Sequence, residues 1–162
     1  CAGQLMVALP FALMNGIMMH NNYLLLALFV LIWVNDSGAY IVGSLTAKLP
    51  KGNHKMFPRV SPAKSWEGLV GGILFSLLAG YIFFRVGWTA EMGLLNSLLF
   101  ACAGSIFGTL GDLMESLFKR TLGVKDSGKI MPGHGGVLDR FDSLLLAVPV
   151  VYLLFVYLPF VL

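Results

Sequence analysis

Charge is scarce in this sequence of 162 residues, of which only 12% are Asp, Glu, Lys or Arg. A soluble domain typically carries about 25% charged residues, because its surface faces water. Apolar residues make up 57% of the chain, and the mean hydropathy is +0.82. This composition excludes an ordinary soluble domain and predicts an integral membrane protein.

Cysteine is also scarce, and a targeting signal is lacking. Cys1 and Cys102 are too few and too far apart for a disulfide framework or a metal cluster. No basic segment precedes a short apolar run and a cleavage site, so we expect no secretory signal peptide. The chain opens on Cys1 rather than Met, which suggests a piece of a longer protein.

Long apolar runs are what the sequence has in abundance. A helix needs about 20 mostly apolar residues to cross a bilayer. Five runs approach this length and predict an all-α polytopic membrane protein with about five transmembrane helices. The predicted spans are residues 2–19, 23–45, 69–84, 94–111 and 144–162.

The basic residues fall mainly in two of the connecting segments. They are Lys48, Lys51, Lys55, Arg59 and Lys64 after the second span, and Lys119, Arg120, Lys125, Lys129 and Arg140 after the fourth. Two spans separate these segments, so both are expected on one side, which the positive-inside rule makes the cytoplasm. Topology signalling and contact with anionic headgroups would also explain such loops.

Asp36 lies near the middle of the second predicted span. An Asp at a helix centre costs about 3 kcal/mol on insertion scales, which the apolar run 24–32 offsets. An ionisable residue at this depth indicates a functional site by default. The alternative is a structural hydrogen bond to a polar side chain on another helix.

The stretch from Gly111 to Asp142 is the richest in chemistry. If the fourth helix continues past Gly111, Asp112 and Ser116 share a face with Glu115. Asp139 and Asp142 lie three residues apart at the start of the fifth predicted helix. Carboxylates from two helices suit a divalent cation, and magnesium takes one or two of them. Ordinary helix N-terminal acids would give the same pattern in the fifth helix.

Basic and glycine-rich residues accompany these carboxylates. Positive charge suited to a polyphosphate comes from Lys119, Arg120, Lys125 and Arg140. The backbone N–H groups of residues 133–136 could approach a phosphate closely, although a flexible turn has the same composition. His134 could bind a phosphate or anchor this loop.

The first basic segment ends in residues 61–68, Ser-Pro-Ala-Lys-Ser-Trp-Glu-Gly. Pro62 predicts a turn, and Ser65 predicts the N-cap of the next helix. Lys64 lies just before that helix, where it could bind an anion.

These motifs together resemble those of the CDP-diacylglycerol synthases, the phosphatidate cytidylyltransferases. The matching positions are Ser116, Lys119, Arg120, Lys125, Asp126, Pro132, His134, Gly135, Gly136, Asp139, Arg140 and Asp142. Residues 35–40 and 61–68 resemble upstream motifs of the same family. Met131 is a mild departure, since the family more often has Leu, Ile or Phe there, and Met fills similar space.

The resemblance implies that CTP and phosphatidic acid give CDP-diacylglycerol and pyrophosphate, with Mg²⁺ and a monovalent cation such as K⁺ as cofactors. It implies catalytic roles for Asp112, Lys119, Arg120, Lys125, Asp126, Asp139, Arg140 and Asp142, with Asp112, Asp139 and Asp142 at the metal. It implies substrate-binding roles for Asp36, Lys64, Ser116, His134, Gly135 and Gly136.

The same resemblance predicts the setting of the protein. Residues 1–162 are expected to form one transmembrane catalytic domain, the C-terminal part of a longer protein. We expect a homodimer in the bacterial inner membrane with a cytoplasmic active site, and no nucleic-acid partner.

Two other classes of protein compete with this prediction. A transporter could use Asp36 and the other carboxylates as a cation or proton path, but it would not require the basic, glycine-rich segment beside Asp139. The CDP-alcohol phosphotransferases use closely spaced helical aspartates with an intervening Asp-Gly and Ala-Arg, which this sequence lacks.

Overall fold

Helices dominate the computed structural model, which describes residues 2–50, 52–58, 60–121, 123 and 141–157. The helices are α1 (Ala2–His20), α2 (Asn22–Thr46), α3 (Trp66–Val86), α4 (Gly93–Thr121) and α5 (Asp142–Tyr152). A short 3-10 helix, η1 (Ala90–Met92), precedes α4, and a π-helical turn, η3 (Leu153–Tyr157), follows α5. The strands are β1 (Lys55–Phe57) and β2 (Ser61–Ser65).

Three helices in the described ranges are long and apolar enough to cross a membrane, namely Asn22–Thr46, Trp66–Val86 and Ala90–Thr121. A fourth apolar helix, Asp142–Val156, is shorter. The predicted second, third and fourth spans are therefore confirmed as helices of membrane-crossing length. The first and fifth predicted spans also contain helices, α1 and α5, and the count of five spans stays a prediction.

Local signals in the sequence fix where α2 and α3 begin and end. The side chain of Asn21 accepts a hydrogen bond from the Tyr23 backbone N–H at 2.8 Å. Ser65 accepts one from the Gly68 N–H at 3.1 Å, which confirms the predicted N-cap of α3. Gly87 ends α3 with a φ of 98°, a conformation that favours glycine.

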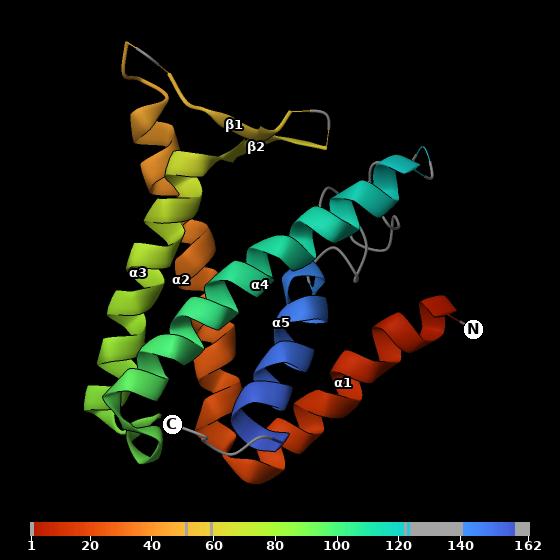
Figure 1. Ribbon diagram of the computed structural model, residues 1–162, viewed down its shortest axis with the longest axis vertical. Coiled ribbons are helices and arrows are strands. Elements are labelled where there is room, and N and C mark those ends of the chain that lie inside the picture. The colour runs from red at the N-terminus through yellow and green to blue at the C-terminus, as the bar shows by residue number, and fades with distance from the viewer. Residues whose placement is uncertain (1, 51, 59, 122, 124–140, 158–162) are drawn as a thin grey trace, which may run out of the picture.

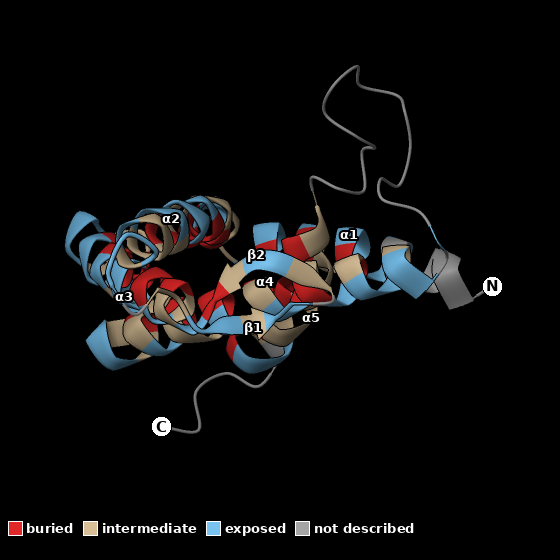
Figure 2. Cartoon of the chain, turned by 90° about the horizontal axis from the view of Figure 1, so that it is seen from above, coloured by how far each residue is buried: buried red, intermediate tan, exposed pale blue. Residues whose placement is uncertain are grey.

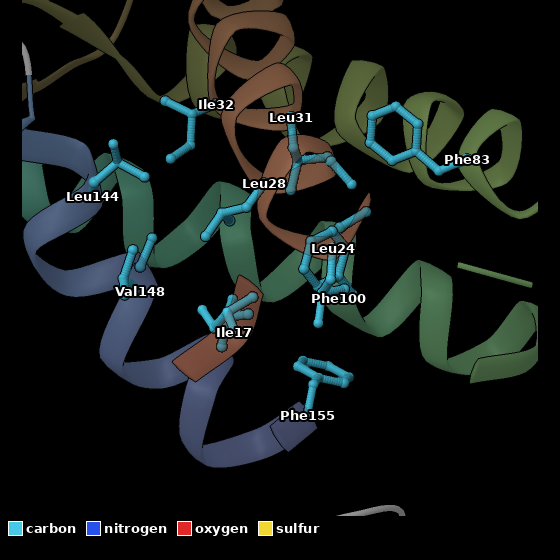
Figure 3. Packing of buried hydrophobic residues seen from close by; sticks show 14 of the residues in the cluster. Ile17, Leu24, Leu28, Leu31, Ile32, Phe83, Phe100, Leu144, Val148 and Phe155 are labelled. Atoms are coloured by element: carbon cyan, nitrogen blue, oxygen red, sulfur yellow. The ribbon is translucent and has the colours of Figure 1, made fainter. Parts of the chain in front are cut away.

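The helices pack as two groups joined by α4. α2 lies along α3, α4 crosses this pair obliquely, and α5 packs between α4 and α1 (Figure 1). Buried side chains from four helices meet at the centre, including Ile17, Leu28, Phe100 and Val148 (Figure 3). The buried faces turn inward, and exposed residues lie on the outer faces (Figure 2). Exposed apolar side chains such as Leu74 and Leu78 on α3 suit contact with lipid.

The segment between α2 and α3 forms a hairpin, where a loop was predicted. β1 pairs antiparallel with β2, with Lys55 opposite Ser65 and Phe57 opposite Ser61. Pro62 lies in β2 rather than in the predicted turn. Proline is tolerated there because a two-stranded ribbon has free edges that need no donor. The fold is therefore mostly helical with one small β-hairpin, which corrects the all-α prediction.

The hairpin and the C-terminal end of α4 lie toward the same end of the molecule (Figure 1). The connection between α3 and α4 lies toward the opposite end. This arrangement brings the hairpin with Lys64 and the end of α4 with Lys119 and Arg120 to one side, as the alternation of spans and loops predicts for these residues.

Candidate functional site

A row of polar side chains follows one face of α4. Ser105, Thr109, Asp112 and Ser116 are spaced by four, three and four residues, which keeps them on one side of the helix. Ser116 Oγ donates a hydrogen bond to Asp112 Oδ1 at 3.3 Å. The fourth helix does continue past Gly111, where the predicted span ends, since α4 ends at Thr121.

The second element of the site is the Asn35–Asp36 pair in α2. Asn35 is 3% exposed and bonds to α4: its Oδ1 accepts from Ser105 Oγ at 2.5 Å. Its Nδ2 donates to Thr109 Oγ1 at 3.2 Å. Asp36 is exposed and faces the space between α2, α4 and the hairpin, where it lines two cavities.

The hairpin contributes Lys64, which reaches across to α4. Its Nζ lies 2.5 Å from Asp112 Oδ2 and donates a hydrogen bond to the Thr109 carbonyl oxygen at 3.2 Å. The side chains of Lys64 and Asp112 are 22% and 33% exposed, so this ion pair is partly shielded from water. Seen from above, the hairpin passes over α4 (Figure 2).

A second set of contacts ties the hairpin to the start of α3. His54 Nδ1 and Glu67 Oε1 are 2.7 Å apart, and the His54 backbone N–H donates to both oxygens of Glu67 at 3.1 and 3.2 Å. These bonds fix the base of the hairpin and, with it, the strand that carries Lys64.

Two cavities adjoin these residues and share two of them. One, of about 260 Å³, lies under the hairpin and is lined by Lys64, Tyr40 and Met56 among others. The other, of about 570 Å³, lies toward α5 and is lined by Trp33, Asp142 and apolar residues. Asp36 and Asp112 line both cavities and so form part of the wall between them.

α5 reaches this wall through a close approach to α4 at Gly111. A Cβ at Gly111 would lie 2.7 Å from the Asp142 carbonyl oxygen and 3.0 Å from that of Ser143. Only glycine leaves room for α5 to start here, which brings Asp142 beside Asp112 at the α5-side cavity. Asp112 and Asp142, two carboxylates from different helices, therefore line the same cavity.

Glu115 is a further carboxylate on this part of α4. It is 5% exposed, and its Oε2 lies 3.0 Å from Lys119 Nζ, while its Oε1 has no hydrogen-bond partner among the described residues. No group of three or more His, Cys, Asp or Glu that could hold a metal occurs in the described ranges. Magnesium needs only one or two carboxylates beside water and phosphate oxygens, so Asp112 and Asp142 fit that ion.

Comparison with known proteins identifies the family of this chain. A model of the Cytidylyltransferase family matches residues 2–158. The chain belongs to this family. The match covers both the helical bundle and the hairpin, so every element of the site described above falls inside it.

Three relatives of this cytidylyltransferase-family chain carry the same name. Proteins named phosphatidate cytidylyltransferase from Haemophilus influenzae and Staphylococcus haemolyticus are 45% and 47% identical to it over 133 and 136 residues. These matches cover 80% and 83% of this chain, and 44% and 49% of the relatives. A protein of the same name from Staphylococcus aureus is 42% identical over 136 residues, 83% of this chain and 49% of its own. The chain thus spans about half the length of the curated relatives it matches.

The structure brings together part of the residue set predicted for this cytidylyltransferase-family site. Asp36, Lys64, Asp112 and Asp142 line the two cavities, and Ser116 bonds to Asp112. Lys119 and Arg120 lie in the last turn of α4. The other predicted residues lie outside the described ranges: Lys125, Asp126, His134, Gly135, Gly136, Asp139 and Arg140.

Asn35, Ser105 and Thr109 were not among the predicted site residues, yet the structure joins them at the base of the site. The signal was present, because Ser105 and Thr109 continue the spacing of Asp112 and Ser116 along α4. It was overlooked because hydroxyl residues inside an apolar helix usually bond to their own backbone.

Proposed function

We propose that this chain carries the active site of a phosphatidate cytidylyltransferase, which converts CTP and phosphatidate into CDP-diacylglycerol and pyrophosphate. Family membership and the shared name of the relatives support this proposal. The structural observation that carries it is the wall formed by Asp36 and Asp112, which two cavities share and which Lys64 reaches. A transfer between two phosphate-bearing substrates needs two binding spaces beside one charged centre.

Magnesium is the cofactor that these residues fit. Asp112 and Asp142 would hold the ion, with Asp139 as the third predicted ligand, and a monovalent cation such as K⁺ would accompany it. The buried Oε1 of Glu115 has no hydrogen-bond partner among the described residues and would be available nearby as a further metal ligand. When bound, magnesium neutralises phosphate charge and orients the phosphate oxygens.

The residues of the chain then perform binding and charge neutralisation. A phosphate oxygen of phosphatidate attacks the α-phosphorus of CTP, the new P–O bond forms, and pyrophosphate leaves. The attacking phosphate is already anionic, so no general base is required. Lys64 exchanges Asp112 for a substrate phosphate, while Lys119 and Arg120 neutralise the leaving pyrophosphate.

The residues outside the described ranges complete this proposal as predicted from the sequence. Basic charge for the nucleotide would come from Lys125 and Arg140, and close phosphate contacts from His134, Gly135 and Gly136. Asp126 would act beside them. We further propose five membrane spans, with both basic segments on the cytoplasmic side of a bacterial inner membrane, and a homodimeric assembly.

The test follows two phosphorus atoms of CTP separately. Purified protein is incubated with phosphatidate, Mg²⁺ and CTP labelled at either the α- or the γ-phosphorus, and lipids are then extracted. The α-label is expected in the organic phase and the γ-label in water. Omitting phosphatidate or adding a chelator should keep both labels in water, and Mg²⁺ in excess of the chelator should restore the transfer.

Matched variants sharpen this test. Asp112→Asn is expected to abolish transfer of the α-label, whereas Glu91→Gln, at the opposite end of the molecule in η1, should leave it unchanged. Cation-dependent solute uptake without any nucleotide turnover would instead favour a transporter. Transfer of both labels to lipid would exclude the reaction proposed.

A further inference from the structure

The amide of Asn35 uses its hydrogen-bonding capacity to join two helices. Its oxygen accepts from Ser105 Oγ at 2.5 Å, and its nitrogen donates to Thr109 Oγ1 at 3.2 Å and to Asp36 Oδ1 at 3.5 Å. Ser105 and Thr109 lie four residues apart on α4, so one side chain of α2 links two successive turns of its neighbour. The amide is 3% exposed, which keeps water from competing for these bonds.

This link lies directly beneath the charged wall of the site. Asp36 is the next residue after Asn35 on α2, and Asp112 is three residues after Thr109 on α4. The third helix closes the space behind the amide: a Cβ at Gly72 would lie 2.5 Å from Asn35 Oδ1 and 3.0 Å from the Asn35 carbonyl oxygen. The amide is therefore held between α3 and α4, one residue before Asp36 on α2 and bonded one turn before Asp112 on α4.

Stability alone accounts poorly for such a residue. Interhelical hydrogen bonds inside membranes contribute on average only about 0.6 kcal/mol. Without the amide, the hydroxyls of Ser105 and Thr109 can bond to carbonyl oxygens of their own helix. Displacement of a catalytic group by about 1 Å, in contrast, can cost about 100-fold in rate.

We propose that Asn35 is a positioning residue, which fixes the α2–α4 crossing so that Asp36 and Asp112 are held at the separation the transfer reaction requires. The kinetic part of this inference rests on the proposed function. Asn35 lines the cavity under the hairpin, but its amide bonds to Ser105, Thr109 and Asp36, so it acts through the placement of the two carboxylates.

The kinetic test compares Asn35→Leu with Asn96→Leu. Asn96 is the matched control, because its Nδ2 bonds only locally, to the carbonyl oxygen of Met92 in the adjoining η1 at 2.8 Å, and not to another long helix. For Asn35→Leu we expect kcat to fall by about 10- to 100-fold and the Mg²⁺ concentration for half-activation to rise. The midpoint of thermal unfolding in detergent should change little. A fall in kcat that only follows the folded fraction, with unchanged Mg²⁺ dependence, would contradict the proposal.

A conservative pair at Thr109 separates hydrogen bonding from packing. Thr109→Ser keeps the hydroxyl that accepts a hydrogen bond from Asn35. Thr109→Val keeps the shape of the side chain and loses that hydroxyl. We expect Thr109→Ser to retain most of the activity and Thr109→Val to reproduce the altered Mg²⁺ dependence of Asn35→Leu. Equal behaviour of the two variants would count against the role of this bond.

A cysteine pair tests the crossing without any reference to activity. A Cβ at Gly108 would lie 3.6 Å from Ile32 Cγ1, so Ile32→Cys with Gly108→Cys joins α2 to α4 close to Asn35. In a background in which Cys1 and Cys102 are replaced by alanine, oxidation should form this disulfide readily, because disulfide geometry is restrictive and the helices are held in register. Asn35→Leu should slow its formation several-fold, and Asn96→Leu should not.

The two tests fail in different ways. An unchanged disulfide rate in Asn35→Leu overturns the positioning role, whatever the kinetics show. A slowed disulfide in a protein that transfers no label from CTP overturns the proposed function and leaves Asn35 as the residue that fixes the crossing.

Discussion

At the scale of single residues, the contact between Lys64 and Asp112 has the most direct chemical meaning. The two groups are 2.5 Å apart and partly shielded, so each is the main charge partner of the other among the described residues. A cation bound at Asp112 and a phosphate bound at Lys64 would together replace this contact, and each side chain would still have a partner of opposite charge. The ion pair therefore holds both side chains in place in the absence of substrate.

Replacing Lys64 by Met tests this role. The Met side chain keeps most of the volume and loses the charge, so we expect turnover of CTP to fall by about 100-fold, as on removal of one donor from a charge-stabilising site. Lys48→Met is the control, because Lys48 is exposed at the end of α2. Near-normal turnover of Lys64→Met, measured by label transfer, would contradict the assignment.

Residues whose role depends on local spacing could be predicted from the sequence. The cap at Ser65 and the shared face of Asp112 and Ser116 follow from helix geometry alone. The pairing of Lys64 with Asp112 did not, because 48 positions separate them along the chain and only the packed hairpin joins them. Asn35 was missed for the same reason, since its partners lie on another helix.

At the scale of elements, the contact between α4 and α5 depends on the absence of one methyl group. Gly111→Ala would place a Cβ 2.7 Å from a backbone oxygen of α5, which cannot move aside as a flexible side chain can. We expect it to destabilise the protein by about 1–3 kcal/mol and to reduce activity further, because α5 carries Asp142.

Gly108 provides the matched control one turn earlier on the same helix. A Cβ there would meet Ile32 Cγ1 at 3.6 Å and Ser143 Cβ at 3.9 Å, which is ordinary contact. The Gly108→Ala variant should therefore have a thermal unfolding midpoint close to that of the unaltered protein. If both variants lose the same amount of stability, the contact at Gly111 does not limit the approach of α5.

The hairpin makes a second prediction at this scale. Glu67→Ala removes the acceptors of three contacts to His54. We expect trypsin to cleave after Lys55 several-fold faster in this variant, because the base of the hairpin is no longer tied to α3. Glu91→Ala, which removes an exposed acid at the other end of the molecule, should leave the cleavage rate unchanged.

The helices were more predictable than the hairpin, for a physical reason. Long apolar runs specify membrane-crossing helices by composition, and α2 and α3 begin and end within three residues of the predicted spans. β1 and β2 have only three and five residues and no apolar alternation. They are held by distant contacts, chiefly those of His54 and Lys64, which the sequence does not display.

At the scale of the whole molecule, the arrangement of the helices predicts which segments share a side of the membrane. Single cysteines at Lys48 and Thr121, introduced after replacing Cys1 and Cys102, should react with an impermeant maleimide only in inverted vesicles. A cysteine at Glu91, in the α3–α4 connection, should react only in right-side-out vesicles. Labelling of positions 48 and 121 from opposite sides would contradict the arrangement in Figure 1.

Properties of the whole molecule could be predicted where they depend on composition or on the even number of spans between the two basic segments. The scarcity of charge predicted membrane helices, and the placement of lysine and arginine predicted the shared side of the two basic segments. The predicted cluster of Asp112 with Asp139 stays a prediction, because Asp139 lies outside the described ranges. Asp142, three residues beyond it, does meet the α4 carboxylate at one cavity.

The length of α4 bears on where the two proposed substrates would meet. Its 29 residues measure about 43 Å at about 1.5 Å per residue, against about 30 Å for the hydrocarbon layer. Asp112 lies about 28 Å along this axis from Gly93, within the last ten residues of the helix and toward the end that carries Lys119 and Arg120. In the proposed reaction, a nucleotide in water and a phospholipid in its leaflet would therefore meet toward this end of the helix.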